Sequence, residues 1–381
     1  MNRVAIKPEL LQWARGRSGL SIDALRQRFP KVEAWESGVL HPTLKQLEAF
    51  AKATFTPVGF LFLDEAPVES VPIPDFRTVA NVHMGQPSPD LLDTIYLCQQ
   101  RQDWYRDFAG AVGDEPLEFV GSARSKDDVV KTAATIRSAL CFDLEERRLT
   151  PTWTDALRRF IGQADALGIL IMVSGVVGSN NRRKLDPQEF RGFALADSLA
   201  PLVFINGADS KAAQMFTLAH EIAHIWLGQS AVSDAEALSI PDDAIEKWCN
   251  QVAAELLVPL KAIREEYNSE IELGEEINRL ARRFKVSTLV VLRRIHDAGG
   301  LNSTAYWKAY HDELDRIRAL PAGTGGNFYL TLGARAGKTF ARALVVSTLE
   351  GRTSYTEAFR LLGFKKMATF QKLGQTLGVL G

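Results

Sequence analysis

The 381-residue sequence is poor in cysteine and has no long hydrophobic run. Its three cysteines, Cys98, Cys141 and Cys249, form no CxxC pair, which argues against a disulfide scaffold, a zinc ribbon and an iron–sulfur site. The longest apolar stretches, such as residues 168–177, fall far short of the roughly 20 residues that cross a bilayer. The first residues lack an apolar segment of signal-peptide length. We therefore expect a cytoplasmic globular protein with no membrane partner.

Net charge is also nearly absent, at −1, but its distribution is uneven. Residues 1–60 hold nine Lys or Arg and five Asp or Glu, and residues 303–381 hold eleven and five, so the ends carry +4 and +6 and the middle −11. Basic ends around an acidic centre predict modules with different partners, although chance segregation of surface charge gives the same pattern.

Hydrophobic periodicity and turn residues predict both helices and strands. Short helices are expected up to residue 66, followed by a proline-rich extended connector with a Pro-Asp-Phe-Arg sequence at 74–77. A β-branched run predicts a buried strand at 168–177, and 190–197 with 200–207 read as a strand pair. Further helices are expected at 91–109, 126–142, 154–167, 211–228 and 245–259.

The strongest chemical signal is the HExxH sequence His220-Glu221-Ile222-Ala223-His224 within the helix expected at 211–228. Positions i and i+4 share one helical face, so both imidazoles can reach one ion, and Glu221 lies beside it as a base for a nucleophilic water. HExxH also occurs by chance. Here the surrounding helix is largely apolar, and titratable groups there are costly unless they are paired or bind a metal. The pattern predicts a zinc hydrolase.

A catalytic zinc usually has three protein ligands, and the helix expected at 245–259 offers Glu246 and Glu255. These two are about half a turn apart around the helix and cannot face the same ion. We favour Glu246 as the third ligand, with Asn250 on the same face as a supporting partner or a helix-packing group. Glu255 then supports the site or is solvated. Asp234 and Glu236 in the intervening loop are weaker ligand alternatives.

The segments Phe216–Gly228 and Glu246–Pro259, with a strand pair before them, resemble the ImmA/IrrE family of metallopeptidases. Cys249 and Val252 depart from the family pattern, which usually has Ala and Phe there. The resemblance implies a zincin-like α+β fold, zinc on His220, His224 and Glu246, and Glu221 as the catalytic base. Known members cleave helix-turn-helix repressors and thereby release genes for stress response or mobile-element transfer.

Residues 10–62 resemble the XRE (Cro/CI-like) helix-turn-helix family through Trp35-Glu36-Ser37-Gly38 and His41–Leu47. The ten residues from Leu25 to Trp35 are about four fewer than usual, so the recognition helix is abbreviated. Arg26, Arg28 and Lys31 are the candidate DNA contacts. A degenerate domain used for protein contacts is the competing interpretation.

We therefore expect an α+β protein with four parts: a helix-turn-helix domain at 1–66, a connector and helix at 67–125, a zincin-like metallopeptidase domain at 126–302, and a mixed, basic C-terminal domain at 303–381.

The sequence Gly333-Ala-Arg-Ala-Gly337-Lys338-Thr339 is one residue too short for a phosphate-binding loop.

The resulting hypothesis is a zinc-dependent regulatory endopeptidase, with another divalent ion such as Mn²⁺ as the alternative cofactor. Its expected partner is a repressor, or an antitoxin or toxin, encoded nearby, with DNA as a further candidate. The competing hypothesis is a DNA-binding regulator or antitoxin whose peptidase fold serves to bind a partner protein.

Overall fold

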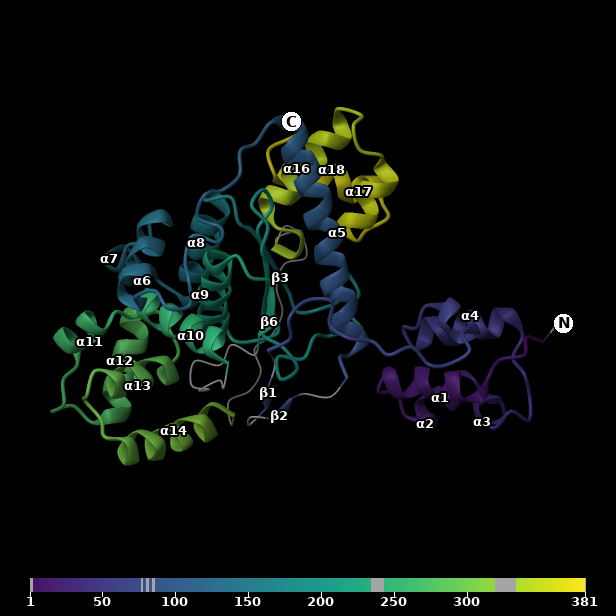
Figure 1. The fold of residues 1–381 in the computed structure, drawn as a ribbon, viewed down its shortest axis with the longest axis horizontal. Coiled ribbons are helices and arrows are strands. Elements are labelled where there is room, and N and C mark those ends of the chain that lie inside the picture. Colours follow the sequence, from purple (N-terminus) through teal and green to yellow (C-terminus); the bar gives the residue numbers. More distant parts are fainter. Residues whose placement is uncertain are drawn as a thin grey trace. The chain divides into compact units, whose positions relative to one another are not determined.

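The computed structural model describes residues 3–76, 78–79, 82–83, 86–233, 243–318 and 334–380. It separates into two compact units, Met1–Pro72 with Gly85–Asp93 and Ile73–Met84 with Thr94–Gly381. The chain is rich in helices and contains a small mixed sheet of four strands, which confirms the α+β class with a helical N-terminus (Figure 1). No helix among the described residues is both long enough and apolar enough to cross a membrane.

The first unit is a set of short helices around an aromatic core. Phe29, Trp35 and Phe50 contact one another with ring centroids 5.9–6.4 Å apart. The side chain of Ser21 accepts a hydrogen bond from the first turn of the second helix, and Thr43 with Gln46 forms a capping box on the fourth, so side-chain caps fix both helix starts. The elements are α1 (Pro8–Arg17), α2 (Ile22–Arg28), α3 (Val32–Glu36), α4 (Leu44–Ala53) and the 3₁₀ helix η1 (Val58–Phe62).

The proline-rich connector contains more structure than the sequence predicted. Strands β1 (Thr78–Val79) and β2 (Val82–His83) form a small antiparallel hairpin. Before it, Pro74–Phe76 runs beside a strand of the main sheet, and Asp75 forms a parallel bridge with Val232. The sequence predicted an extended chain here and no paired strands, because prolines remove backbone donors and give few helix signals.

The main sheet has the strand order β3-β5-β4-β6. Its strands are β3 (Leu170–Ser174), β4 (Gly192–Leu195), β5 (Leu202–Asn206) and β6 (Ala231–Ser233). β3 and β5 are parallel, whereas β4 is antiparallel to both of its neighbours. Phe193 and Phe204 face each other across β4 and β5 with stacked rings 4.9 Å apart. The predicted strands are confirmed, but β6 was not foreseen, since three residues carry too short a pattern to read.

The sheet lies between two layers of helices (Figure 1). Helices α8 and α9 cover one face, where Ile171 joins their core. On the other face Met172 contacts Arg101 of α5, and α16 packs against β3. The helices of this part are α5 (Pro89–Val112), α6 (Val129–Ala139), α7 (Leu144–Arg148), α8 (Trp153–Ala166), α9 (Lys211–Leu227), α10 (Ala244–Leu257), α11 (Leu260–Glu266), α12 (Leu273–Phe284), α13 (Thr288–Asp297), α14 (Ser303–Arg318), α16 (Lys338–Leu349), α17 (Tyr355–Leu362) and α18 (Met367–Thr376).

Helix α9 is buried along nearly its whole length, as its all-round apolar sequence predicts. Ser210 caps its N-terminus, and Gly228 ends it in the left-handed conformation with φ of 67°. The last carbonyls of α9 are not left unpaired, because Gly121 N–H donates to Ile225 O and Ala123 N–H donates to Trp226 O. The helix is thereby fixed at both ends.

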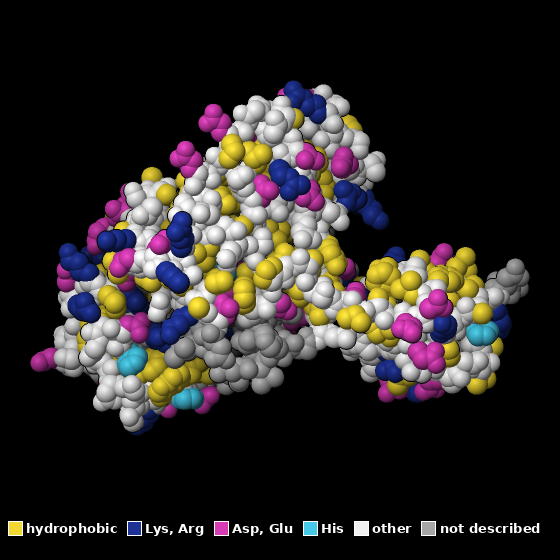
Figure 2. Space-filling model, in the orientation of Figure 1, with side chains coloured by type: hydrophobic (Ala, Val, Ile, Leu, Met, Phe, Trp, Pro, Cys, Tyr) yellow, Lys and Arg dark blue, Asp and Glu magenta, His cyan; other side chains and the backbone are white. Residues whose placement is uncertain are grey.

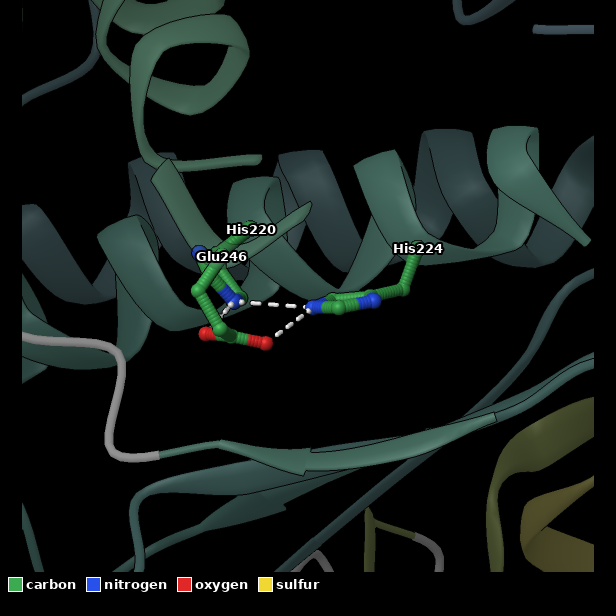
Figure 3. Close-up of side chains that lie close together, drawn as sticks. All are labelled: His220, His224 and Glu246. Carbon is green, nitrogen blue, oxygen red and sulfur yellow. Dashed lines mark hydrogen bonds and ion pairs between the residues drawn. The ribbon is translucent and has the colours of Figure 1, made fainter. Parts of the chain in front are cut away.

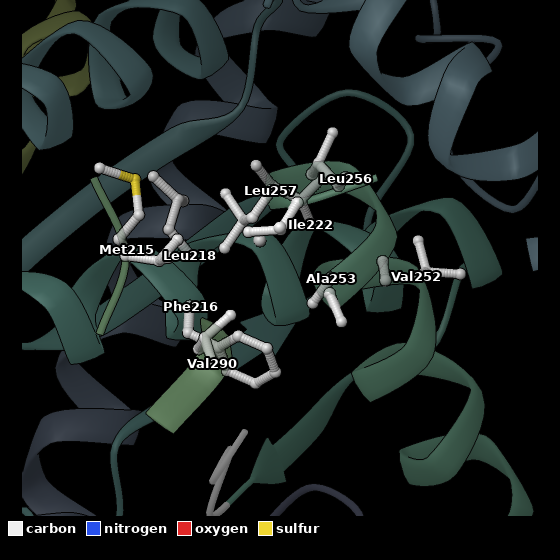
Figure 4. Packing of buried hydrophobic residues seen from close by; sticks show 14 of the residues in the cluster. Met215, Phe216, Leu218, Ile222, Val252, Ala253, Leu256, Leu257 and Val290 are labelled. Atoms are coloured by element: carbon white, nitrogen blue, oxygen red, sulfur yellow. The ribbon is translucent and has the colours of Figure 1, made fainter. Parts of the chain in front are cut away.

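Helix α10 packs closely against α9 (Figure 4). Ile222 of α9 lies beside Leu256 and Leu257 of α10 in this core, and all three side chains are fully buried. Cys249 and Ala253 of α10 are buried, and their small side chains let the two helix backbones come close. Close packing of these two helices sets how near their polar side chains can approach.

The burial of the cysteines predicts their reactivity. Burial raises the pKa of the Cys98 thiol to about 12 and that of Cys249 well above its usual range, whereas Cys141 is exposed. Since the thiolate is the reactive form, one thiol per folded chain should react rapidly with Ellman's reagent, and all three after unfolding in guanidinium chloride. The Cys141→Ser variant should show no rapid reaction. Two or more rapidly reacting thiols in the folded wild-type protein would contradict the buried placement.

Candidate metal centre

Two histidines of α9 face each other at the centre of the second unit. His220 and His224 lie one turn apart, both are completely buried, and their Nε2 atoms are 3.1 Å apart. This is the arrangement that the i, i+4 spacing predicts. Two imidazole nitrogens that face each other at this distance in a dry interior need a proton or a cation between them.

Glu246 approaches the same point from α10 (Figure 3). Its Oε2 lies 3.2 Å from Nε2 of His220, and its Oε1 lies 2.9 Å from Nε2 of His224. Asp243 caps α10 by accepting from the backbone N–H groups of Ile245 and Glu246, so the first turn that carries Glu246 is well fixed. The structure thus brings together the three side chains singled out in the sequence.

The electrostatics of Glu246 suit a cation. Burial opposes ionisation of this carboxyl, but the two histidines outweigh burial and lower its pKa to about 2. Glu246 is therefore an anion at neutral pH, held in a site with 4 % exposure. Its negative charge and two imidazole nitrogens form a donor set that zinc and neighbouring divalent ions accept.

The spacing of these atoms also fits a metal. Bond lengths of about 2.0–2.2 Å in a tetrahedral zinc site place neighbouring ligand atoms about 3.3–3.6 Å apart. The contacts between the two nitrogens and the carboxylate measure 2.9–3.2 Å. A displacement of a few tenths of an ångström for each side chain would accommodate the ion.

Asn250 fixes the orientation of one imidazole. It lies one turn beyond Glu246 on α10, and its Oδ1 is 2.9 Å from Nδ1 of His220. An amide oxygen only accepts, so Nδ1 carries a proton, and Nε2 faces Glu246 and His224 as the nitrogen that can bind an ion in place of its proton. Asn250 therefore holds His220 in the tautomer that a metal requires.

Phe76 of the connector contacts the other imidazole, which the sequence analysis did not foresee. Its ring stacks on that of His224 with centroids 6.4 Å apart and an angle of 18° between the planes. Nδ1 of His224 is buried and has no hydrogen-bond partner among the described residues. The Pro-Asp-Phe-Arg sequence was the only available signal, and its distance along the chain gave no reason to place it here.

Glu221 lies beside the cluster with one oxygen bound and the other unbound. Ser233 of β6 donates its hydroxyl hydrogen to Oε1 at 2.9 Å, while the buried Oε2 has no hydrogen-bond partner among the described residues. Burial raises the pKa of Glu221 to about 8, well above its usual range. A carboxyl with a free oxygen and a pKa near neutrality can take up and release a proton.

Gly192 of β4 makes room for this carboxyl. A Cβ at this position would lie 2.6 Å from Cγ2 of Thr217, 2.9 Å from the carbonyl oxygen of Phe204 and 3.1 Å from Oε1 of Glu221. The sheet backbone and α9 therefore approach too closely for any other residue. Ser233 and Gly192 were both missed from the sequence, because neither belongs to a local motif.

Other acidic candidates have different surroundings. Glu255 is buried and pairs with Arg294, and its Oε2 accepts from the backbone N–H of Leu260 at 3.2 Å. Glu255 neither contacts the metal centre nor is solvated, so both expectations for it were wrong. The sequence could not predict its pairing with Arg294, which is distant along the chain. Asp234 and Glu236 lie outside the described residues.

The three candidate DNA contacts are exposed on the first unit. Arg26 forms ion pairs with Asp23 and Glu33, so part of its charge is already compensated. Arg28 lies over the ring of Phe29 at 5.5 Å, and Lys31 immediately precedes the short helix α3. Figure 2 shows acidic and basic side chains interleaved on the visible face of this unit. DNA binding by these residues stays a prediction.

Gly337, the glycine directly before α16, packs against the main sheet. A Cβ at Gly337 would lie 2.9 Å from the carbonyl oxygen of Ile171 in β3. In the first turn of α16, Thr339 lies close to the half-buried carboxyl of Asp165. A carboxyl beside this helix N-terminus disfavours a phosphate there.

The close approach at Gly192 predicts a loss of stability in Gly192→Ala. The variant should lower the free energy of unfolding by about 1–3 kcal/mol, because the added methyl group has no free volume. Gly162→Ala is the matched control, since Gly162 lies in α8 with nothing within 4 Å of an added Cβ. That change should stabilise the protein by about 0.5–1 kcal/mol. Equal effects of the two substitutions in urea unfolding would refute the packing described for β4.

The raised pKa of Glu221 predicts a pH-dependent effect of Glu221→Gln on metal-free protein. As pH rises from 4.5 to about 8 the unfolded chain loses this proton before the folded chain does, so the folded wild type loses stability over that window. Glutamine cannot ionise. At about pH 9 the free energy of unfolding of the variant should therefore exceed that of wild type by a few kcal/mol, since each pKa unit corresponds to about 1.4 kcal/mol. Near pH 5 the difference should be much smaller.

This second prediction is checked by urea unfolding of chelator-treated protein at both pH values. A difference between wild type and Glu221→Gln that is the same at the two pH values would show that the carboxyl is not protonated in the folded state.

Comparison with known proteins adds family information for two segments. Residues 336–376 match the model of a domain of unknown function, DUF8813. No curated protein matches the chain. Residues 164–296 match the Peptidase_M78 model, described as an IrrE N-terminal-like domain, and this range contains all of β3 to β6, α9 and α10. The segment that carries His220, His224 and Glu246 is thus similar to a metallopeptidase domain, and the match supports the ImmA/IrrE family.

Proposed function

We propose that the protein is a zinc-dependent regulatory endopeptidase that cleaves a helix-turn-helix transcriptional repressor. The observation that carries this proposal is the convergence of His220, His224 and Glu246 beside a second, uncompensated carboxyl, Glu221. The match of residues 164–296 to a peptidase domain supports it independently.

His220, His224 and Glu246 would hold the ion, and Asn250 would keep His220 oriented toward it. The chemistry supplied by zinc bound there is a lowered pKa for water, to about 7, and polarisation of the scissile carbonyl. Mn²⁺ would supply related chemistry with the same ligands.

Glu221 would act as the general base and then as the general acid. Its Oε2 has no hydrogen-bond partner among the described residues. This oxygen accepts the proton of the attacking water and then passes that proton to the leaving amine. Ser233 holds Oε1, so the carboxyl cannot rotate both oxygens away from the site. Gly192 lets the carboxyl lie against the sheet.

A binding platform would have no use for Glu221. A buried carboxyl with a partnerless oxygen destabilises a fold, because its charged form loses hydration without compensation. This cost favours catalysis over the alternative of a regulator whose peptidase fold only binds a partner. The repressor as substrate rests on the resemblance to ImmA/IrrE peptidases.

The first test is metal content. Purified full-length protein should hold about one zinc per chain by mass spectrometry, because the three donors form a single site. His224→Ala should lose the ion, whereas His311→Ala should keep it, since His311 is exposed and lies outside the cluster. Retention of the full zinc content in His224→Ala would contradict the assignment of the centre.

The second test is cleavage of repressor proteins encoded by adjacent genes. Wild-type protein should cut one of them at one position, and Glu221→Gln should be slower by about 10²–10⁴-fold while it keeps zinc, since it loses only proton transfer. Glu265→Gln changes an exposed glutamate and should cleave normally. Undiminished cleavage by Glu221→Gln would remove its catalytic role.

A further inference from the structure

The outer edge of β6 is occupied by the chain's own connector. Val232 N–H donates to Pro74 O at 2.9 Å, and Phe76 N–H donates to Val232 O at 3.0 Å. With the parallel bridge between Asp75 and Val232, Pro74–Phe76 lies on β6 as a fifth, very short strand. The other edge of β6 pairs with β4.

This edge borders the candidate metal centre. The residue after Val232 is Ser233, whose hydroxyl donates to Glu221, so the connector pairs with the strand next to the residue that contacts the general base. The ring of Phe76 stacks on His224, one of the three candidate ligands. Three consecutive connector residues therefore contact both the strand beside the centre and the centre itself.

The connector segment lies on the surface and is not part of the core. Pro74 and Asp75 are exposed, and Phe76 is half-buried. Residues 73–84 group with the second unit, while their neighbours on both sides, 1–72 and 85–93, group with the first. The segment is thus held at the centre by its own contacts and is continuous at both ends with the other unit.

Extended peptides bind exposed strand edges by the same main-chain hydrogen bonds, and their side chains then fill adjacent sites. We propose that the edge of β6 is the peptide-binding strand of the centre, and that Pro74–Phe76 occupies it in competition with an extended peptide that places an aromatic side chain over His224. This inference rests on the proposed function for the nature of the partner. The connector then masks the centre until a peptide or partner displaces it.

The test measures binding of a fluorescein-labelled synthetic peptide of residues 71–78 to full-length protein by fluorescence anisotropy. All proteins carry Glu221→Gln, so that the peptide is not consumed. Phe76→Pro removes both the N–H donor to Val232 and the ring on His224, whereas Phe76→Ala removes the ring alone. Val68→Pro is the matched control, because it places a proline in the same connector at a residue that is 90 % exposed.

Phe76→Pro should bind the peptide at least tenfold more tightly than Val68→Pro, with Phe76→Ala between them. Hydrogen exchange at the Val232 amide should be faster in Phe76→Pro and become slow again with saturating peptide. Equal affinity in all three proteins would overturn the proposal. If Phe76→Pro does not fold, the comparison of Phe76→Ala with Val68→Pro decides.

A cleavage assay separates this inference from the proposed function. With Glu221 restored, Phe76→Ala should cleave the repressor faster than wild type. Peptide binding in the expected order without cleavage by any protein would leave the strand assignment standing and refute the peptidase. Cleavage by wild type with equal peptide affinity in every variant would support the peptidase and refute the strand assignment.

Discussion

The contact between α9 and α10 is the constraint on which the rest of the centre depends. Apolar side chains such as Ile222 and Leu256 drive this contact, and the small residues Cys249 and Ala253 let the two helix backbones come close. Without that closeness the carboxylate of Glu246 could not reach within 3.2 Å of both imidazoles. The hydrophobic core thus determines the electrostatics, because it forces three polar groups together where water cannot separate them.

The sheet supplies the second half of the site. Gly192 of β4 and Ser233 of β6 hold Glu221 against the strands, so its free oxygen is next to the cluster formed by the two helices. The same strand β6 carries the connector on its other edge, which brings Phe76 to His224. Helix packing therefore builds the ion site, and the sheet positions the base and a place for an extended chain.

Much of this could be predicted from local pattern. The i, i+4 spacing of His220 and His224, and the helical face shared by Glu246 and Asn250, are properties of one helix each, and the structure places all four together. Predictions were incomplete where a contact joins segments that are distant in sequence. β6 has only three residues, too few to show an alternating pattern. The need for glycine at position 192 comes from atoms of β5 and α9, and the burial of Glu255 comes with its ion pair to Arg294.

The central claim is that two imidazoles and one carboxylate share a single cation, and X-ray absorption spectroscopy of the zinc-loaded full-length protein tests it most directly. The account predicts nitrogen and oxygen neighbours at about 2.0–2.2 Å, with outer-shell scattering from two imidazole rings. A sulfur neighbour at about 2.3 Å, which would bring in Cys249, or a spectrum without imidazole scattering, would contradict it.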